Sequence, residues 1–439
     1  MEIDIKRIII ILAIIVFILV LSIILIITKS EKKINENTAA SPGKKDEEIV
    51  IQENIKEVTS RNDYYSVKTC INKYYSYYNE IYNSEYDDSY AKKAVIGMLD
   101  EAYIQDKVIT ESNIKQKLTQ INKTIVKIDK MYVKQNNKEM FTYYVTGKIK
   151  NQISKESLDF ELMVKINMKD RVFSLIPTDY ITQKYGNIQN IIDGMIDENI
   201  DVTITKNEYN IFDYASITDE QYVQDLLRDY QDDIVYNIDN AYEKLDSDYK
   251  KIRFGTIDSF KSYIKDNAKY LIIAQINQYQ RTNYTDYNQY VCMDKKGDYY
   301  IFKETGIMEY KILLDNHTID LPQFTEKYNS TRNENKAAMN IEKFKDAINT
   351  QDYKYAYEKL DTSFKEKNYP TQESFEEFVK NKLFDRNNFT YTDIEEKNGL
   401  YIFKLVVSDL TAKVKENLTL NVVMQLNEGT DFTMSFSIE

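Results

Sequence analysis

Few residues in this chain are of types that could carry catalysis or bind a metal. His317, in the sequence LDNHTID, is the only histidine among 439 residues. A two-histidine zinc helix therefore cannot form, and a Ser-His-Asp triad would have only this one base to use. The simplest interpretation is a histidine at the end of a loop or strand whose ring nitrogens are hydrogen-bonded. We predict neither a catalytic base nor a metal ligand here.

The two cysteines, Cys70 and Cys292, lie far apart in the sequence. Cys70 belongs to a stripe of mostly apolar residues at helical spacing: Val67, Cys70, Ile71, Tyr74, Tyr78, Ile81 and Tyr82. A thiol on such a stripe is typical of a small buried apolar residue. We therefore predict no redox or metal chemistry at the cysteines.

The 10 glycines exclude two nucleotide-binding motifs. The closest pair is Gly186 and Gly194, whereas the dinucleotide fingerprint and the P-loop both need glycines within about five positions. The serine-hydrolase elbow is also absent from the sequence. We predict no cofactor.

Three aspartates, Asp100, Asp246 and Asp361, recur at equivalent positions, each directly after a leucine. The leucine falls on the apolar face of a predicted helix, so the aspartate lies near the edge of that helix, beside a turn. This placement fits local capping better than three copies of an active site. Since the chain has 70 acidic residues, no carboxylate pair can be selected for acid–base catalysis. The sequence therefore predicts no catalytic residue.

The segment Tyr74-Tyr75-Ser76-Tyr77-Tyr78 covers more than one face of its predicted helix. Tyrosine offers a large contact area and a hydroxyl, so one interpretation is an interaction surface. The other is that tyrosine stands where phenylalanine or leucine would serve, because AT-rich codons, typical of a low-GC bacterium, encode it often. Both remain open.

A repeat supplies the elements that must position these residues. The segments 241–267 and 356–382 share 11 identities in 27 aligned positions, including AYEKLD in both, and Leu99-Asp100 begins an earlier copy. Leucines and aromatic residues four positions apart predict a buried helical face. Thr110, Thr256 and Thr371 each precede a second apolar pattern and are predicted N-caps.

Alternating apolar residues follow the predicted helices in each copy. Examples are the runs 141–145, 158–166, 308–314, 418–426 and 432–438. Alternation with period two predicts half-buried antiparallel strands, and the pairs Asn136-Asn137, Lys296-Gly297 and Asn398-Gly399 predict hairpins. The expected fold class is α+β, with three repeats of helices followed by a curved antiparallel sheet.

An apolar run of about 20 residues, Ile8–Ile27, is long enough to cross a bilayer of about 30 Å as a helix. A cleaved signal peptide is the alternative, although this run is longer than usual for one. Positive charges on both sides, at Lys6 and Arg7 and then at Lys29, Lys32 and Lys33, slightly favour a cytoplasmic body. The layout of a bacterial signal anchor favours an extracytoplasmic body, which we predict.

The resulting organisation has seven parts: tail 1–7, transmembrane helix 8–27, flexible linker 28–60, first repeat 61–180, connector 181–214, second repeat 215–330 and third repeat 331–439. A formal net charge of −12 makes nucleic acid an unsuitable partner. The expected partners are the bilayer, through Ile8–Ile27, and other proteins or further copies of the chain.

This order of elements resembles the cone-shaped fold of the nuclear-transport-factor-like superfamily, also called cystatin-like. Tandem copies on one membrane anchor are similar to the single-span extracytoplasmic subunits of Gram-positive conjugation machines, relatives of a small VirB-type component of type IV secretion systems. Those proteins commonly have one or two such domains, so a third copy departs from their pattern. The resemblance implies a scaffold or binding protein without catalytic activity. An enzyme that uses one cone cavity is the alternative.

Overall fold

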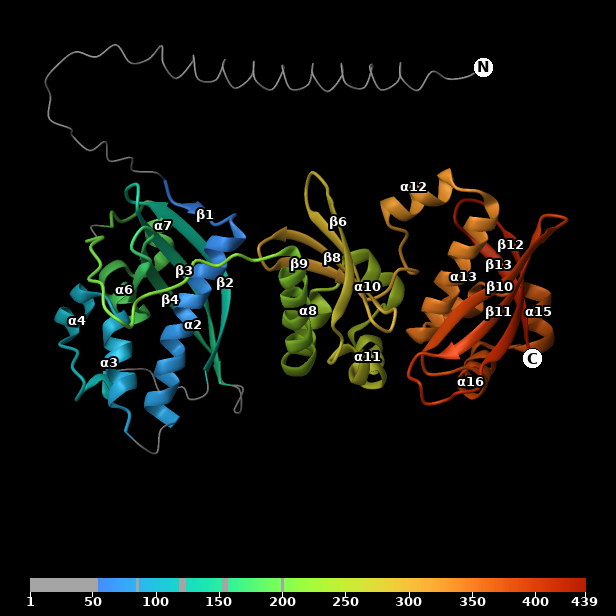
Figure 1. Cartoon of the computed structure of the whole chain (residues 1–439), viewed down its shortest axis with the longest axis horizontal. Coiled ribbons are helices and arrows are strands. Elements are labelled where there is room, and N and C mark those ends of the chain that lie inside the picture. Colours follow the sequence, from blue (N-terminus) through green and yellow to red (C-terminus); the bar gives the residue numbers. More distant parts are fainter. Residues whose placement is uncertain (1–53, 84–86, 118–123, 152–156, 199–200) are drawn as a thin grey trace, which may run out of the picture. The chain divides into compact units, whose positions relative to one another are not determined.

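The computed structural model describes residues 54–83, 87–117, 124–151, 157–198 and 201–439 (Figure 1). The predicted tail, transmembrane helix 8–27 and most of the predicted linker lie outside these residues. Within them, no helix is both long enough and apolar enough to cross a membrane.

The fold is α+β, as predicted, with three antiparallel sheets of 5, 4 and 4 strands. In each sheet every strand pairs with its neighbour in the sequence. The first sheet contains β1 (Lys56–Glu57), β2 (Thr124–Gln135), β3 (Met140–Asn151), β4 (Ser157–Asn167) and β5 (Val172–Ile176). The second contains β6 (Ile276–Asn283), β7 (Asn288–Asp294), β8 (Tyr299–Gly306) and β9 (Glu309–Leu313). The third contains β10 (Asn387–Lys397), β11 (Leu400–Asp409), β12 (Leu418–Leu426) and β13 (Phe432–Ile438).

Each sheet and its helices form what we call a module. The first module has α2 (Arg61–Asn83), α3 (Ser89–Met98), α4 (Glu101–Lys107), α5 (Ile114–Lys117), α6 (Thr178–Tyr185) and α7 (Ile188–Ile192). The second has α8 (Asp219–Tyr236), α9 (Ile238–Glu243), α10 (Ser247–Arg253) and α11 (Ile257–Leu271). The third has α13 (Asn333–Asn349), α14 (Tyr353–Glu358), α15 (Thr362–Asn368) and α16 (Gln372–Lys382), preceded by α12 (Pro322–Ser330). The long helices α2, α8 and α13 pack against their own sheets.

The repeated Leu-Asp pair has the same structural role in all three modules. Leu99, Leu245 and Leu360 are buried and form isolated parallel bridges to Leu175, Ile312 and Met434, on the last strand of each sheet. Each following aspartate caps the next helix: Asp100, Asp246 and Asp361 accept hydrogen bonds from backbone amides in the first turns of α4, α10 and α15. The predicted local capping role is therefore confirmed.

The threonine caps are confirmed in two modules out of the three. Thr256 accepts a hydrogen bond from Ser259 N, and Thr371 accepts one from Ser374 N. Thr110 behaves differently: its own amide donates to Asn113 Oδ1 at 2.8 Å, and α5 begins only at Ile114. The carbonyl of Thr110 accepts a hydrogen bond from Ile114 N at 2.9 Å, as an N-cap carbonyl does, but its hydroxyl pairs with Ser112. The predicted side-chain cap at Thr110 is therefore not formed.

Other local predictions can be checked in the same way. The strands predicted at 418–426 and 432–438 are β12 and β13, and Asn398-Gly399 forms the tight turn between β10 and β11, with positive φ at both residues. β1 lies inside the predicted linker 28–60, and α7 lies inside the predicted connector 181–214. Cys70 and Cys292 are fully buried.

The tyrosine-rich segment belongs mainly to the core. Tyr74, Tyr75 and Tyr78 are almost completely buried and pack against one another as edge-on or tilted ring pairs. Tyr77 is only partly buried and packs on Tyr90. Most of these rings therefore fill the core of the first module, as phenylalanine or leucine would, and Tyr75 also contacts Phe160 of β4.

The buried apolar residues show which modules depend on each other. One continuous cluster runs through the first and second modules, from Val58 to Leu321, and includes the contact between the rings of Tyr65 and Tyr222. The third module has its own separate cluster, from Ala337 to Phe436. The first and second modules thus share a core, while the third does not share it.

Candidate functional site

The strongest polar centre lies where the second module contacts the third. The loop that follows β9 carries Asp315 and His317, and Arg253 ends α10. Across from them, Asp346 lies near the end of α13, and Asp352 is the N-cap of α14. We call these five residues the histidine cluster.

His317 is the centre of the histidine cluster, and its side chain has 0% exposure. Its Nδ1 lies 2.8 Å from Asp346 Oδ2 and 3.6 Å from Asp315 Oδ1, and its Nε2 lies 3.1 Å from Asp352 Oδ2. The ring also packs against Tyr355 at 4.8 Å between centroids. Both ring nitrogens therefore have carboxylate partners, and neither reaches solvent.

The carboxylates are held by further hydrogen bonds. Asp315 Oδ2 accepts from the hydroxyls of Tyr249, at 2.8 Å, and Thr318, at 3.0 Å. Asp346 Oδ2 accepts from the backbone amide of Asn316 at 3.1 Å. Such contacts fix the orientation of each carboxylate before any ligand or proton arrives.

Arg253 supplies the permanent positive charge of the cluster. Its Nε lies 3.2 Å from Asp352 Oδ2 and 3.6 Å from Asp315 Oδ2, and its Nη2 donates to the carbonyl of Thr350 at 3.0 Å. Burial alone would lower the pKa of Arg253, but the charge of Asp352 and the other acidic neighbours raises it overall. The guanidinium therefore stays charged inside the contact.

The same carboxylates act on His317. Burial alone would lower its pKa, but the charge of Asp315 and the hydrogen bonds to Asp346 and Asp352 raise it to about 10. Conversely, burial would raise the pKa of Asp352, but its hydrogen bond from His317 and the charge of Arg253 lower it overall. The cluster therefore attracts positive charge to the imidazole position, either as a proton or as another cation.

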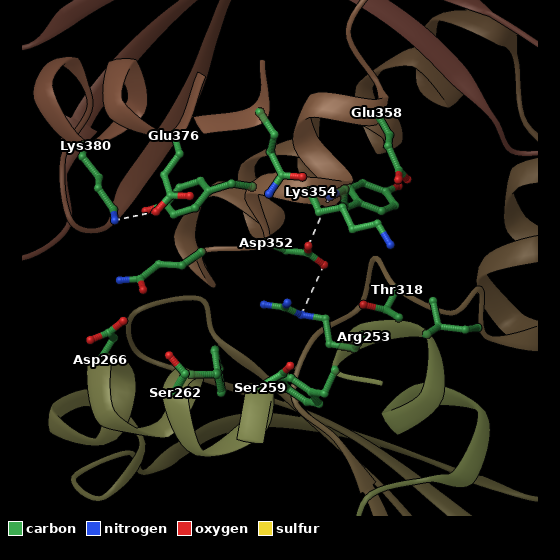
Figure 2. Close-up of a pocket in the computed structure, with 17 residues that line it drawn as sticks. Arg253, Ser259, Ser262, Asp266, Thr318, Asp352, Lys354, Glu358, Glu376 and Lys380 are labelled. Atoms are coloured by element: carbon green, nitrogen blue, oxygen red, sulfur yellow. Dashed lines mark hydrogen bonds and ion pairs between the residues drawn. The ribbon is translucent and has the colours of Figure 1, made fainter. Parts of the chain in front are cut away.

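A cleft with a volume of about 430 Å³ borders the histidine cluster. Figure 2 shows Arg253 and Asp352 at its centre, with Ser259, Ser262 and Asp266 of the second module on one side and Glu376, Lys380 and Glu358 of the third on the other. The lining carries charges of both signs together with hydroxyl groups. This composition suits a polar ligand or protein segment and does not select a single charge.

His317 does not line this cleft. A general base must come within hydrogen-bonding reach of the proton that it removes, directly or through one water. In this arrangement His317 has no direct contact with a ligand bound in the cleft.

Three residues of the cluster have the geometry of a metal site. Among the residues that the structure describes, donor atoms of Asp315, His317 and Asp346 lie within 4.8 Å of one another. The sequence prediction of a histidine with partnered ring nitrogens is confirmed by the two carboxylate contacts. The prediction that it binds no metal remains a prediction.

Sequence reasoning did not select Arg253, Asp315, Asp346 or Asp352. Asp315 lies two positions from the histidine, which was a usable signal, but the other residues come from different elements. Only the contact between two modules brings them together, and no spacing in the sequence encodes that contact.

A second polar centre joins the first module to the second. Arg61 Nη1 lies 2.6 Å from Asp219 Oδ1, and Arg61 Nη2 lies 2.9 Å from Glu304 Oε2. The guanidinium carbon is also 3.7 Å from the centre of the Tyr222 ring. Glu304 is 4% exposed and accepts further hydrogen bonds from Tyr222 and Asn288. The second module therefore holds the Arg61 side chain of the first module through charges, hydrogen bonds and an aromatic ring.

No known protein-family model matches the sequence, and no curated protein is significantly similar to it.

Proposed function

We propose that the chain is a membrane-anchored extracytoplasmic scaffold or binding protein without catalytic activity. The observation that carries this proposal is the location of the buried histidine and the buried arginine pairs. The only histidine is sealed inside a contact between modules. The largely buried arginine pairs Arg253–Asp352, Arg386–Asp298 and Arg61–Glu304 run between modules as well. Their burial between modules supports a role in holding the modules together.

Two further observations support the proposal. Each sheet is covered by a long helix that packs on it, which fits repeated cone-shaped domains of the kind that the sequence resembles. The apolar run Ile8–Ile27 is long enough to be an anchor. The likeness to bitopic subunits of conjugation machines points to proteins of such a machine as the partners.

The test is co-purification of the full-length chain from its native membrane after mild cross-linking. We expect a defined set of membrane or envelope proteins to be recovered with the wild-type chain. A double variant that inverts two exposed charges of the cleft, Lys354→Glu with Glu358→Lys, should recover less of this set if the cleft is the docking face. Inverting the exposed pair Lys148 and Asp159 of the first module is the matched control.

The results can contradict the proposal directly. A chain that stays in the soluble fraction has no membrane anchor. Recovery of no partner in the wild-type sample excludes a scaffold, and conversion of a small molecule by the purified chain would favour the alternative of an enzyme.

A further inference from the structure

We infer that Asp315, His317 and Asp346 bind one divalent transition-metal ion that joins the second module to the third. The ion would be structural, and the class that fits the ligands is Zn²⁺ or Mn²⁺. The inference concerns the purified chain alone, so it does not depend on which partners the chain has.

The donor atoms of the three proposed ligands lie within 4.8 Å of one another. His317 Nδ1 lies 2.8 Å from an oxygen of Asp346 and 3.6 Å from an oxygen of Asp315. Ions that bind imidazole and carboxylate at about 2.0 to 2.2 Å hold neighbouring donors about 3 to 3.5 Å apart. A small movement of these side chains would therefore centre an ion among them.

Hydrogen bonds from neighbouring side chains orient the proposed ligands. A metal-bound histidine commonly donates its other ring N–H to a carboxylate, which fixes the tautomer. Here Nε2 faces Asp352 Oδ2 at 3.1 Å, and Arg253 holds Asp352 in turn. The hydroxyls of Tyr249 and Thr318 orient the other side of Asp315. The contact at Nε2 leaves Nδ1 directed at the two proposed carboxylate ligands.

The histidine cluster has an excess of buried negative charge. The buried cluster contains three carboxylates, on Asp315, Asp346 and Asp352, and one guanidinium, on Arg253. With a neutral imidazole these groups leave two negative charges uncompensated, and one proton on the ring removes only one of them. A divalent ion bound to neutral His317 compensates both, and uncompensated buried charge is costly.

One more oxygen without a partner lies on the same loop. Asn316 lies between Asp315 and His317, and its Oδ1 is buried without a hydrogen-bond partner in the described part of the chain. A water, or this amide oxygen once it turns toward the three donors, would complete tetrahedral coordination of Zn²⁺, and additional waters would fill the six positions that Mn²⁺ prefers. An imidazole ligand disfavours Mg²⁺ and Ca²⁺, which prefer oxygen donors alone.

Binding is a simple exchange. The hydrated ion loses waters and forms bonds to His317 Nδ1 and to one oxygen of each aspartate. Any proton on Nδ1 leaves to solvent, while the Nε2 proton remains directed at Asp352. No electron is transferred.

The experiment exploits the presence of a single histidine. Full-length chain labelled with ¹⁵N-histidine gives the ring signals of one residue, so they need no assignment. After treatment with a chelator and removal of the chelator, Zn²⁺ or Mn²⁺ is added, with Mg²⁺ as the control ion. Zn²⁺ is diamagnetic and serves for the NMR measurement.

We expect about one ion per chain by elemental analysis and a concentration-dependent rise in Tm with Zn²⁺ or Mn²⁺ but not Mg²⁺. We also expect the ring to change to one N–H, on Nε2, with Nδ1 coordinated. Two ring N–H signals in the presence of saturating Zn²⁺ would overturn the inference, since they show an imidazolium in place of a ligand.

Variants separate this site from other metal-binding surfaces. His317→Gln and Asp346→Asn should abolish the rise in Tm, and Asp352→Asn should weaken the metal affinity about 10- to 100-fold, as for other contacts behind a ligand. Lys354→Ala, in the neighbouring cleft, should bind the ion like wild type. Equal metal binding by wild type and His317→Gln would also overturn the inference. If a variant fails to fold, the NMR measurement on the wild-type chain still shows whether Nδ1 coordinates the ion.

Discussion

Individual buried charges connect the modules. Glu304 of the second module, for example, pairs with an arginine of the first module. Its carboxylate is 4% exposed and pairs with Arg61 of the first module. Removing one partner of a buried pair leaves an uncompensated charge and typically costs about 3 to 5 kcal/mol. We expect Arg61→Met to lower the free energy of unfolding by about this amount in urea titrations.

The control for this prediction is an exposed pair in the same region. Arg228 is 69% exposed where it pairs with Asp225, so Arg228→Met should cost less than about 1 kcal/mol. Equal effects of the two substitutions would mean that Arg61 is not a buried support of Glu304.

Asp298 makes the stability of the second module depend on pH. Burial raises its pKa to about 7, with Asp294 and Asp346 acting in the same direction and Arg386 opposing them. The pKa of Asp298 is higher in the folded chain than in the unfolded chain. The stabilisation that Asp298 gives the folded state is therefore complete below about pH 4 and is lost as the pH rises through about 7.

Between pH 5 and 7 we therefore expect this group to reduce the free energy of unfolding by up to about 1.4 kcal/mol per pH unit. Asp298→Asn should flatten this slope, measured by urea unfolding at a series of pH values. The matched control is Asp248→Asn, at an exposed carboxylate in α10, which should keep the slope of wild type.

At the scale of elements, the repeated leucine should matter more than the repeated aspartate. Leu360 is 1% exposed and bridges to Met434, whereas the Asp361 side chain accepts one hydrogen bond, from Phe364 N. We expect Leu360→Ala to cost about 2 to 5 kcal/mol and Asp361→Ala about 1 kcal/mol. Urea unfolding of both variants measures the difference, and a Leu360 variant as stable as wild type would contradict the shared role of the leucines.

The third module, residues 331–439, should also unfold cooperatively when expressed alone, because its buried cluster is separate from the other. A circular dichroism melt without a cooperative transition would contradict this expectation. Because the first module shares its buried cluster with the second, a fragment containing the first module alone should not unfold cooperatively.

Periodicity and capping predicted most elements because these signals are local. The alternation at 418–426 and the Leu360-Asp361 pair each depend on a few neighbouring residues, and both have the expected structure. The histidine cluster was not predictable in the same way. Asp315 and His317 follow a strand of one module, while Asp346 and Asp352 belong to helices of the next. Their encounter depends on how two modules pack, which no local pattern reports.

At the scale of the whole molecule, the proposed extracytoplasmic location of the body can be measured directly. Both native cysteines are buried, so background labelling should be low. Lys415→Cys places a thiol at an exposed position between β11 and β12. A membrane-impermeant maleimide should label this variant in intact cells. Labelling only after lysis would place the body in the cytoplasm.

The cluster shared by the first two modules has a consequence for synthesis. The chain emerges from its amino terminus, and part of the apolar side of the first module, as in the contact of Tyr65 with Tyr222, is covered only by the second module, whose core extends to Leu321. At about 5 to 20 residues per second, that surface waits on the order of ten seconds for its partner. During this interval the nascent chain is a candidate for chaperone binding, whereas the third module can fold as soon as its last strand is released.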